Sequence, residues 1–386
     1  MPRAFSRTPA QVARWATLIL LLASSACSSG SDPQPSGSQD TETTPASDDA
    51  PSVASPSDKP GSDSIDVGPA ASGTKPKLDA SQLPSKPAEL SDAGQGSAAD
   101  PQAAAGPQGA ADAQVGGNVT PGADGFPKDE PVNTEQMGPH AFAKYDNTMD
   151  TGLNNPTYAS SVVYYPTDAT PPFAATVFSP GFTATKEDYE KFLGPMLASH
   201  GIVILLTSST TTSDPPQARS DDLIAAIAQL GKENTREGGP LKGKLALDRV
   251  CVTGHSMGGG GTLWAASSLG DKIKCALPMQ PWQPGNSFSK VTAPTMFIAA
   301  QNDNVAAVAS NAALFYKSIP DTVPKYYVEF AGASHFLTSN DLGTAYDGQS
   351  RYMIAFYKTF AEGDMRYLDI LNAPMFTELS KYEHKP

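Results

Sequence analysis

The stretch that decides the fold is Arg249-Val-Cys-Val-Thr-Gly-His-Ser-Met-Gly-Gly-Gly-Gly261. Its Val-Cys-Val-Thr run predicts a buried strand, and 258–269 predicts a helix. The Gly-His-Ser-Met-Gly between them matches the G-x-S-x-G turn that lifts a serine to the carboxyl edge of a sheet. Gly254 and Gly258 would let the backbone turn sharply, and the N-terminus of the helix would face developing negative charge. We therefore expect Ser256 to be a nucleophile rather than a structural turn residue.

Strands and helices alternate along the chain on both sides of this turn. The alternation predicts an α/β fold with a mostly parallel central sheet flanked by helices. The segment 279–294 that joins the strand after the turn's helix to the next strand is too short for a cap domain. The expected strands are 161–165, 174–178, 202–206, 249–253, 274–278, 295–300 and 326–330, and the expected helices are 186–200, 220–230, 258–269, 308–318 and 349–361.

A serine nucleophile needs a base, and the chain has five histidines. Of these, His335 follows a predicted strand at the sheet edge that the serine turn also occupies. His255 neighbours the nucleophile, but the turn points it elsewhere, and we expect it to pack beside the site. Asp303 comes just past the end of another strand, whereas Glu329 lies within one. The order Ser256, Asp303, His335 is that of α/β-hydrolases, in which the carboxylate orients the imidazole.

Charge and aromatic residues are divided unevenly along the chain. The net charge of −13 is the balance of +3 over residues 1–27, −11 over 28–130 and −5 over 131–386. Residues 28–130 hold one aromatic side chain, Phe126, and are rich in Ser, Pro, Gly, Ala and Asp, which predicts a disordered acidic linker. That leaves 131–386 for one folded catalytic domain. The acidic balance, without a basic cluster, argues against nucleic-acid binding.

Residues 1–27 have the pattern of an export signal. Three arginines precede the short apolar run 16–23, and Ser24-Ser-Ala-Cys27 follows. This arrangement predicts a bacterial lipoprotein signal, cleaved so that a lipidated Cys27 anchors the protein at the outer membrane or cell surface. Serine stands where such signals usually have leucine, and a secretory signal cut near Ala26 is the alternative. In either case we expect an exported protein, with 28–130 as a flexible tether.

Several short motifs of the folded domain occur together in one known family. They are Tyr164-Tyr-Pro166, Ser179-Pro-Gly-Phe-Thr-Ala184, Ala198-Ser-His-Gly201, 254–263, Pro281-Trp282, Asp303-Asn-Val305, Ala333-Ser-His-Phe336 and Gly363-Asp-Met-Arg-Tyr367. Through them the chain resembles the bacterial cutinases and poly(ethylene terephthalate) (PET) hydrolases. The resemblance implies an α/β-hydrolase fold and a serine esterase that acts through an acyl-enzyme on esters, polyesters such as PET included. A triacylglycerol lipase or a platelet-activating-factor acetylhydrolase acting on monomeric esters is the alternative.

The resemblance also implies roles for residues around the serine. Backbone N–H groups of Phe182 and Met257 would form the oxyanion hole. The side chains of Phe182, Trp282 and Val305 would line the substrate cleft. The chain departs from the family at Phe182, where tyrosine is common, and at Gln283, where histidine or aspartate is usual. These departures bear on polyester preference and not on esterase chemistry.

Cysteine usage leaves one question open. Cys251 and Cys275 fall in consecutive strands that we expect to be neighbours in the sheet. Because bridges across adjacent parallel strands are uncommon, we favour buried free thiols, with a disulfide as the alternative. The C-terminal disulfide of the family is absent, since no cysteine follows Cys275.

The sequence has neither a metal-ligand spacing nor a dinucleotide-binding motif, so we expect no metal and no cofactor. We also expect a monomer, with a shallow, uncapped cleft over Ser256.

Overall fold

The computed structural model describes residues 126, 128, 130–146, 157–285, 287–339, 345–373 and 377–385, apart from the side chains of 345–347. The leader with Cys27 and nearly all of the 28–130 segment lie outside these residues. The signal peptide, the lipid anchor and the disordered tether therefore remain predictions. No helix among the described residues is both long enough and apolar enough to span a bilayer.

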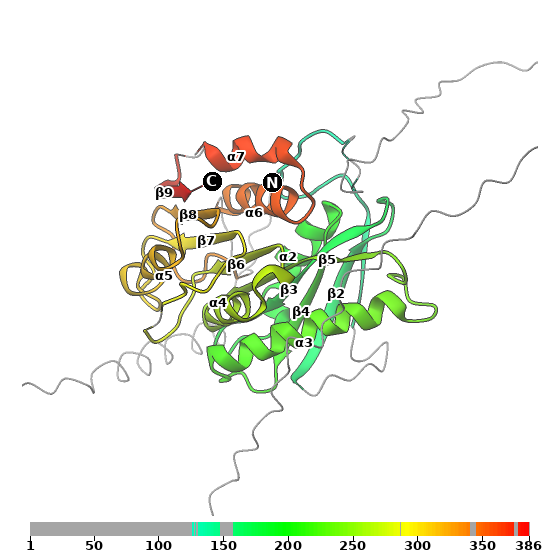
Figure 1. Cartoon of the computed structure of the whole chain (residues 1–386), viewed down its shortest axis with the longest axis horizontal. Coiled ribbons are helices and arrows are strands. Elements are labelled where there is room, and N and C mark those ends of the chain that lie inside the picture. Colours follow the sequence, from blue (N-terminus) through cyan, green and yellow to red (C-terminus); the bar gives the residue numbers. More distant parts are fainter. Residues whose placement is uncertain are drawn as a thin grey trace, which may run out of the picture. The chain divides into compact units, whose positions relative to one another are not determined.

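One sheet forms the centre of the fold (Figure 1). Within the described residues its strands follow the order β1-β2-β4-β3-β5-β6-β7-β8-β9. The strands from β4 to β8 in this order are parallel, and the β1–β2, β2–β4 and β8–β9 pairs are antiparallel. The predicted mostly parallel sheet is thus confirmed. The strands are β1 Phe142–Asp146, β2 Tyr158–Pro166, β3 Phe173–Ser179, β4 Val203–Ser209, β5 Leu245–His255, β6 Cys275–Met279, β7 Thr295–Ala300, β8 Lys325–Phe330 and β9 Leu379–Lys385.

Helices cover both faces of the sheet. Buried side chains of α2, α6 and α7 share one apolar cluster with one face of the strands, and those of α3, α4 and α5 share the other. Successive side chains of a strand point to opposite faces of the sheet and therefore fall in different clusters. In β5, Cys251 belongs to the first cluster, and Val250 and Val252 belong to the second. Single 3₁₀ turns lie at Lys186–Asp188, Gly270–Lys272, Val308–Ser310 and Met365–Tyr367. The helices are α2 Glu190–Ser199, α3 Pro216–Thr235, α4 Met257–Leu269, α5 Ala312–Ser318, α6 Ala345–Phe360 and α7 Leu368–Asn372.

The sequence analysis missed β1 and β9, the strands at the two edges of the sheet. Both are short and mostly solvent-accessible, so neither carries a buried apolar run. Helix α3 begins at Pro216 rather than at 220, because proline fits the first turn of a helix, where its missing N–H costs nothing. The helix expected over 186–200 is divided at Tyr189 into a 3₁₀ turn and α2.

The packed part of the chain begins upstream of residue 131. Phe126 is buried in the cluster beneath α6, and the Lys128 Nζ donates to the Gly363 carbonyl at 3.2 Å. The guanidinium of Arg366 donates to the carbonyl of Glu130 at 2.9 Å. Phe126, Lys128 and Glu130, from the end of the acidic segment, therefore contact the folded body.

The expectation of free thiols is wrong, because Cys251 and Cys275 form a disulfide. The two residues are direct partners in the parallel β5–β6 ladder, and their Cα atoms are 4.7 Å apart. Residues in register present their side chains on the same face, so the two sulfur atoms meet across the ladder. The sequence indicates neighbouring strands but does not give their register, and the register decides whether the cysteines meet.

We expect the disulfide to contribute substantially to stability. It closes a loop of sequence separation 24, for which the loop-entropy relation gives about 3.4 kcal/mol. The double variant Cys251→Ala/Cys275→Ala should lower the free energy of unfolding in urea by at least about that amount. Thiol counting by mass spectrometry on the unfolded, unreduced protein provides the control. Two alkylated thiols from this pair would contradict the bridge.

Candidate active site

The backbone at Ser256 adopts a conformation that non-glycine residues rarely take. Ser256 joins β5 to α4 with φ 55° and ψ −118°. Its N–H donates to the Met279 carbonyl at 3.0 Å, and its carbonyl accepts from the Trp282 N–H at 2.8 Å. These two bonds tie the turn to the end of β6 and to the loop that follows it, and they hold a conformation that costs free energy.

Glycines around Ser256 leave room for this turn. A Cβ at Gly254 would lie 2.3 Å from the Gly258 carbonyl oxygen, and one at Gly258 would lie 2.0 Å from the Ser179 carbonyl oxygen. A Cβ at Gly260 would lie 2.4 Å from the Trp282 carbonyl oxygen. The first turn of α4 therefore packs directly on the backbone of the loops after β3 and β6. No larger residue fits at these positions without moving a backbone.

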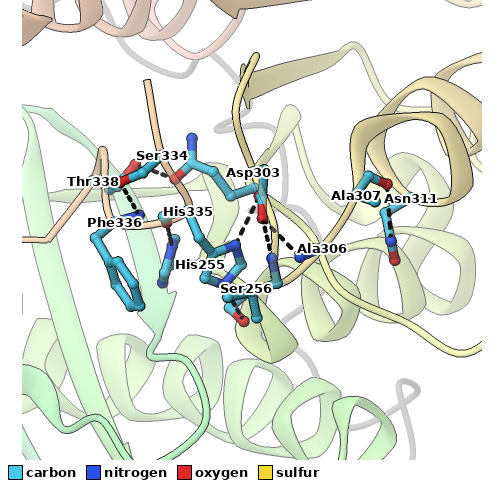
Figure 2. Close-up of polar contacts among 12 residues, drawn as sticks. His255, Ser256, Asp303, Ala306, Ala307, Asn311, Ser334, His335, Phe336 and Thr338 are labelled. Carbon is cyan, nitrogen blue, oxygen red and sulfur yellow. Dashed lines mark hydrogen bonds and ion pairs between the residues drawn. The ribbon is translucent and has the colours of Figure 1, made fainter. Parts of the chain in front are cut away.

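Three side chains from separate strand ends meet at the carboxyl edge of the sheet (Figure 2). The Ser256 Oγ lies 2.9 Å from the His335 Nε2, and the His335 Nδ1 lies 2.8 Å from the Asp303 Oδ2. Since the carboxylate accepts, Nδ1 carries the proton and Nε2 is free to accept from the serine hydroxyl. All three residues are at least 93% buried, with exposed fractions of 6%, 7% and 3% for Ser256, Asp303 and His335. The structure thus brings together the three residues singled out from the sequence.

Asp303 is fixed by the backbone that follows it. Its Oδ1 accepts from the N–H groups of Val305 and Ala306, at 3.0 and 2.7 Å. The other oxygen is left for His335. Three hydrogen bonds set the plane of the carboxylate and, through it, the orientation of the imidazole.

The loop after β3 passes directly over the serine. A Cβ at Gly181 would lie 3.1 Å from the Ser256 Cβ, so the next residue, Phe182, is beside the site. Met257 is the first residue of α4. Within the described part of the chain neither the Phe182 nor the Met257 N–H donates a hydrogen bond to the protein. Two unpaired backbone donors therefore lie next to Ser256 and can receive an anion.

Two other residues expected in the cleft lie on loops bonded to the triad. Trp282 is half-buried, and its backbone N–H donates a hydrogen bond to the Ser256 carbonyl. Val305 is also half-buried, and its backbone N–H donates a hydrogen bond to the Asp303 Oδ1. The described residues contain no group of three or more His, Cys, Asp or Glu side chains placed to bind a metal ion.

His255 packs beside the site, as expected, with its ring 4.9 Å from that of His335 between centroids. Its Nε2 is 2.8 Å from the His335 carbonyl oxygen, and its Nδ1 is 2.8 Å from the Tyr189 hydroxyl. Burial, reinforced by the neighbouring His335, lowers the pKa of His255 to about 3. The ring is therefore neutral at ordinary pH.

Sequence reasoning missed Arg219, a fully buried arginine in the first turns of α3. Its guanidinium ties the loop over Ser256 to the loop after β4, and the Thr183 N–H reinforces this link by donating to the Thr212 carbonyl at 2.9 Å. A single arginine on the inward face of an amphipathic helix is the signal that could have revealed it. Its acceptors are the carbonyls of Pro180 (3.0 Å), Thr212 (2.9 Å) and Asp214 (2.8 Å) and the Ser209 hydroxyl (3.0 Å).

Replacing Arg219 should loosen the loop over the serine. In Arg219→Lys the compact ammonium cannot reach acceptors on two loops at once, and we expect the free energy of unfolding to fall by about 2–4 kcal/mol. Hydrogen exchange of the 181–184 amides should accelerate. The matched control is Arg249→Lys, whose guanidinium lies 3.8 Å from the half-exposed carboxylate of Asp248 and which should change stability by less than about 1 kcal/mol. Equal effects of the two substitutions would contradict the role of Arg219.

Comparison with known proteins identifies the family of the chain. Residues 132–385 match the family described as PET hydrolase-like. Cutinase 1 of Thermobifida cellulosilytica is 35% identical over 232 residues, 58% of this chain and 84% of that protein. The bis(hydroxyethyl) terephthalate hydrolase of Streptomyces coelicolor is 36% identical over 235 residues, 61% of this chain and 71% of that protein. The chain therefore belongs to the PET hydrolase-like family of α/β-hydrolases.

Proposed function

We propose that this protein is an exported serine esterase that cleaves carboxylic esters, polyesters among them, through an acyl-enzyme. Membership of its family makes it a carboxylic ester hydrolase. One observation carries the serine mechanism: the unbroken line of hydrogen bonds from Ser256 through His335 to Asp303, beside two unpaired backbone N–H groups.

The proposed reaction uses each of these groups once per half-reaction. The Ser256 Oγ attacks the ester carbonyl while the His335 Nε2 takes its proton, and Asp303 stabilises the imidazolium that forms. The N–H groups of Phe182 and Met257 bind the negative oxygen of the tetrahedral intermediate. His335 then protonates the departing alcohol, which leaves the acyl group on Ser256. A water molecule then attacks this acyl-enzyme while His335 takes its proton. His335 returns that proton to the Ser256 Oγ as the acid leaves.

The connection between β6 and β7 supports polymeric esters as substrates. Between Met279 and Thr295 the described residues contain neither helix nor strand, so no cap element arises there. A chain at the surface of a solid could therefore reach Ser256 without being enclosed. Phe182 and Trp282 lie on the two loops beside the serine and would pack on the acyl part of the substrate. The relatives named as a cutinase and as a bis(hydroxyethyl) terephthalate hydrolase also support this class of substrate.

Export and anchoring rest on the sequence of the leader. We propose that Cys27 is lipidated and that residues 28–130 tether the catalytic domain to the membrane. The mass of the mature N-terminal peptide tests this directly. A free serine or alanine at that terminus contradicts the lipid anchor.

Loss of the nucleophile or base should abolish turnover without unfolding the protein. We expect Ser256→Ala and His335→Ala each to lower kcat on a soluble short-chain ester by roughly 10⁴–10⁶-fold. The control is Ser267→Ala, which removes a hydroxyl from the far end of α4 and should leave kcat unchanged. Circular dichroism would verify folding. A folded Ser256→Ala that kept a tenth of the activity would rule out the serine mechanism.

Trp282 should matter more for polymers than for small esters. Trp282→Ala removes an aromatic face worth about 0.5–1.5 kcal/mol per stacked pair, which a short acyl ester uses little. We expect a larger fractional loss of product release from polyester film than of kcat/KM on a soluble ester. Phe142→Ala, at an exposed aromatic on the edge strand β1, controls for general adsorption. Equal losses on both substrates, or no polymer hydrolysis by the unchanged protein, would favour a lipase or acetylhydrolase for monomeric esters.

A further inference from the structure

A buried line of hydrogen bonds connects the loop over Ser256 to the backbone of His335. It runs from the Gly181 N–H to the Tyr189 hydroxyl (3.3 Å), then to the His255 Nδ1 (2.8 Å), and from the His255 Nε2 to the His335 carbonyl (2.8 Å). Tyr189, His255 and His335 are each at least 97% buried. Figure 2 shows the His255 ring beside His335, on the side away from Asp303.

The chemistry of the two ends fixes the direction of every bond in this line. The Gly181 N–H can only donate, and the His335 carbonyl can only accept. The His255 Nε2 must therefore carry the ring proton. Because the ring is neutral, its Nδ1 accepts from the Tyr189 hydroxyl, which in turn accepts from the Gly181 N–H. A neutral His255 with its proton on Nε2 satisfies all four groups. A proton on Nδ1 would face the hydroxyl proton of Tyr189, and this hydrogen bond would be lost.

The two ends of the line belong to different parts of the proposed machinery. Gly181 precedes Phe182, whose N–H is one of the two unpaired donors beside Ser256. His335 supplies the general base, and within the described residues its carbonyl accepts from no donor other than His255. The line thus sets the position of the base relative to the loop that would bind the oxyanion.

Close packing of the rings makes this connection stiff. The Tyr189 ring lies 5.4 Å from that of His255 and 4.8 Å from that of Phe178, between centroids. The His255 ring lies 4.9 Å from that of His335. Tyr189 itself occupies the break between the 3₁₀ turn and α2, where its backbone φ of −126° departs from helical values. The break places the hydroxyl inside the fold instead of along a continuous helix face.

We propose that Tyr189 and His255 are positioning residues that hold the base and the oxyanion loop in one reactive geometry. This inference rests on the proposed function, because it needs His335 to act as the base and Phe182 to bind the oxyanion. Neither Tyr189 nor His255 exchanges a proton with the substrate. Their effect is on how often Ser256, His335 and the Phe182 N–H are aligned together, and hence on kcat.

Removing the tyrosine hydroxyl tests the proposal with little change in shape. We expect Tyr189→Phe to lower kcat on a soluble ester by about 5- to 30-fold while KM changes less than about twofold, since small displacements of catalytic groups are costly. The matched control is Tyr357→Phe, which also removes a fully buried hydroxyl with a partner, here Thr253. Both variants should lose stability, and Tyr189→Phe alone should lose kcat. A folded Tyr189→Phe with wild-type kcat overturns the proposal.

Nuclear magnetic resonance of the unaltered full-length chain gives a second readout that does not depend on any variant folding. With histidine labelled by ¹⁵N, His255 should remain neutral with its proton on Nε2 from about pH 5 to about pH 9. A proton on Nδ1, or titration of His255 within that range, would overturn the proposal. Activity retained by Ser256→Ala would instead count against the proposed function, so the two failures are distinguishable.

Discussion

The left-handed turn at Ser256 is the constraint on which the rest of the site depends. A serine with φ 55° is unfavourable unless its surroundings hold it there. Here its N–H is bonded to the last residue of β6 and its carbonyl to the loop that follows, and Gly254 and Gly258 allow strand, helix and the loop after β3 to approach at backbone distance. A substitution at either glycine would separate the elements that this turn joins. The four-glycine run is therefore a packing requirement as well as a motif.

Parallel strands then bring the partners to the same edge. Ser256, Asp303 and His335 each follow the carboxyl end of a strand, and β5, β7 and β8 run in one direction. Hydrogen bonds fix the orientation of two of these residues: two backbone N–H groups donate to Asp303, and the His255 side chain donates to the carbonyl of His335. Before any substrate arrives, the serine hydroxyl is therefore bonded to its base, and two unpaired backbone N–H groups lie beside it.

The sequence was most informative where local pattern and topology agree. Strands such as β4 and β7 contain continuous apolar runs, and the order of the three site residues follows from the order of the strands that carry them. The Cys251–Cys275 disulfide could not be predicted because it depends on register, and β9 could not because an edge strand needs no apolar face. Arg219 and Tyr189 act through loops that are distant in sequence, so only the fold reveals what they contact.

We propose that Ser256 is the nucleophile of an esterase site that is already assembled in the free protein. The most direct measurement is reaction with a fluorophosphonate, followed by mass spectrometry of the digested protein. We expect one fluorophosphonate adduct per chain, on the peptide that contains Ser256, and a loss of ester hydrolysis in proportion to labelling. Labelling at another residue, or full activity in a protein labelled at Ser256, would contradict it.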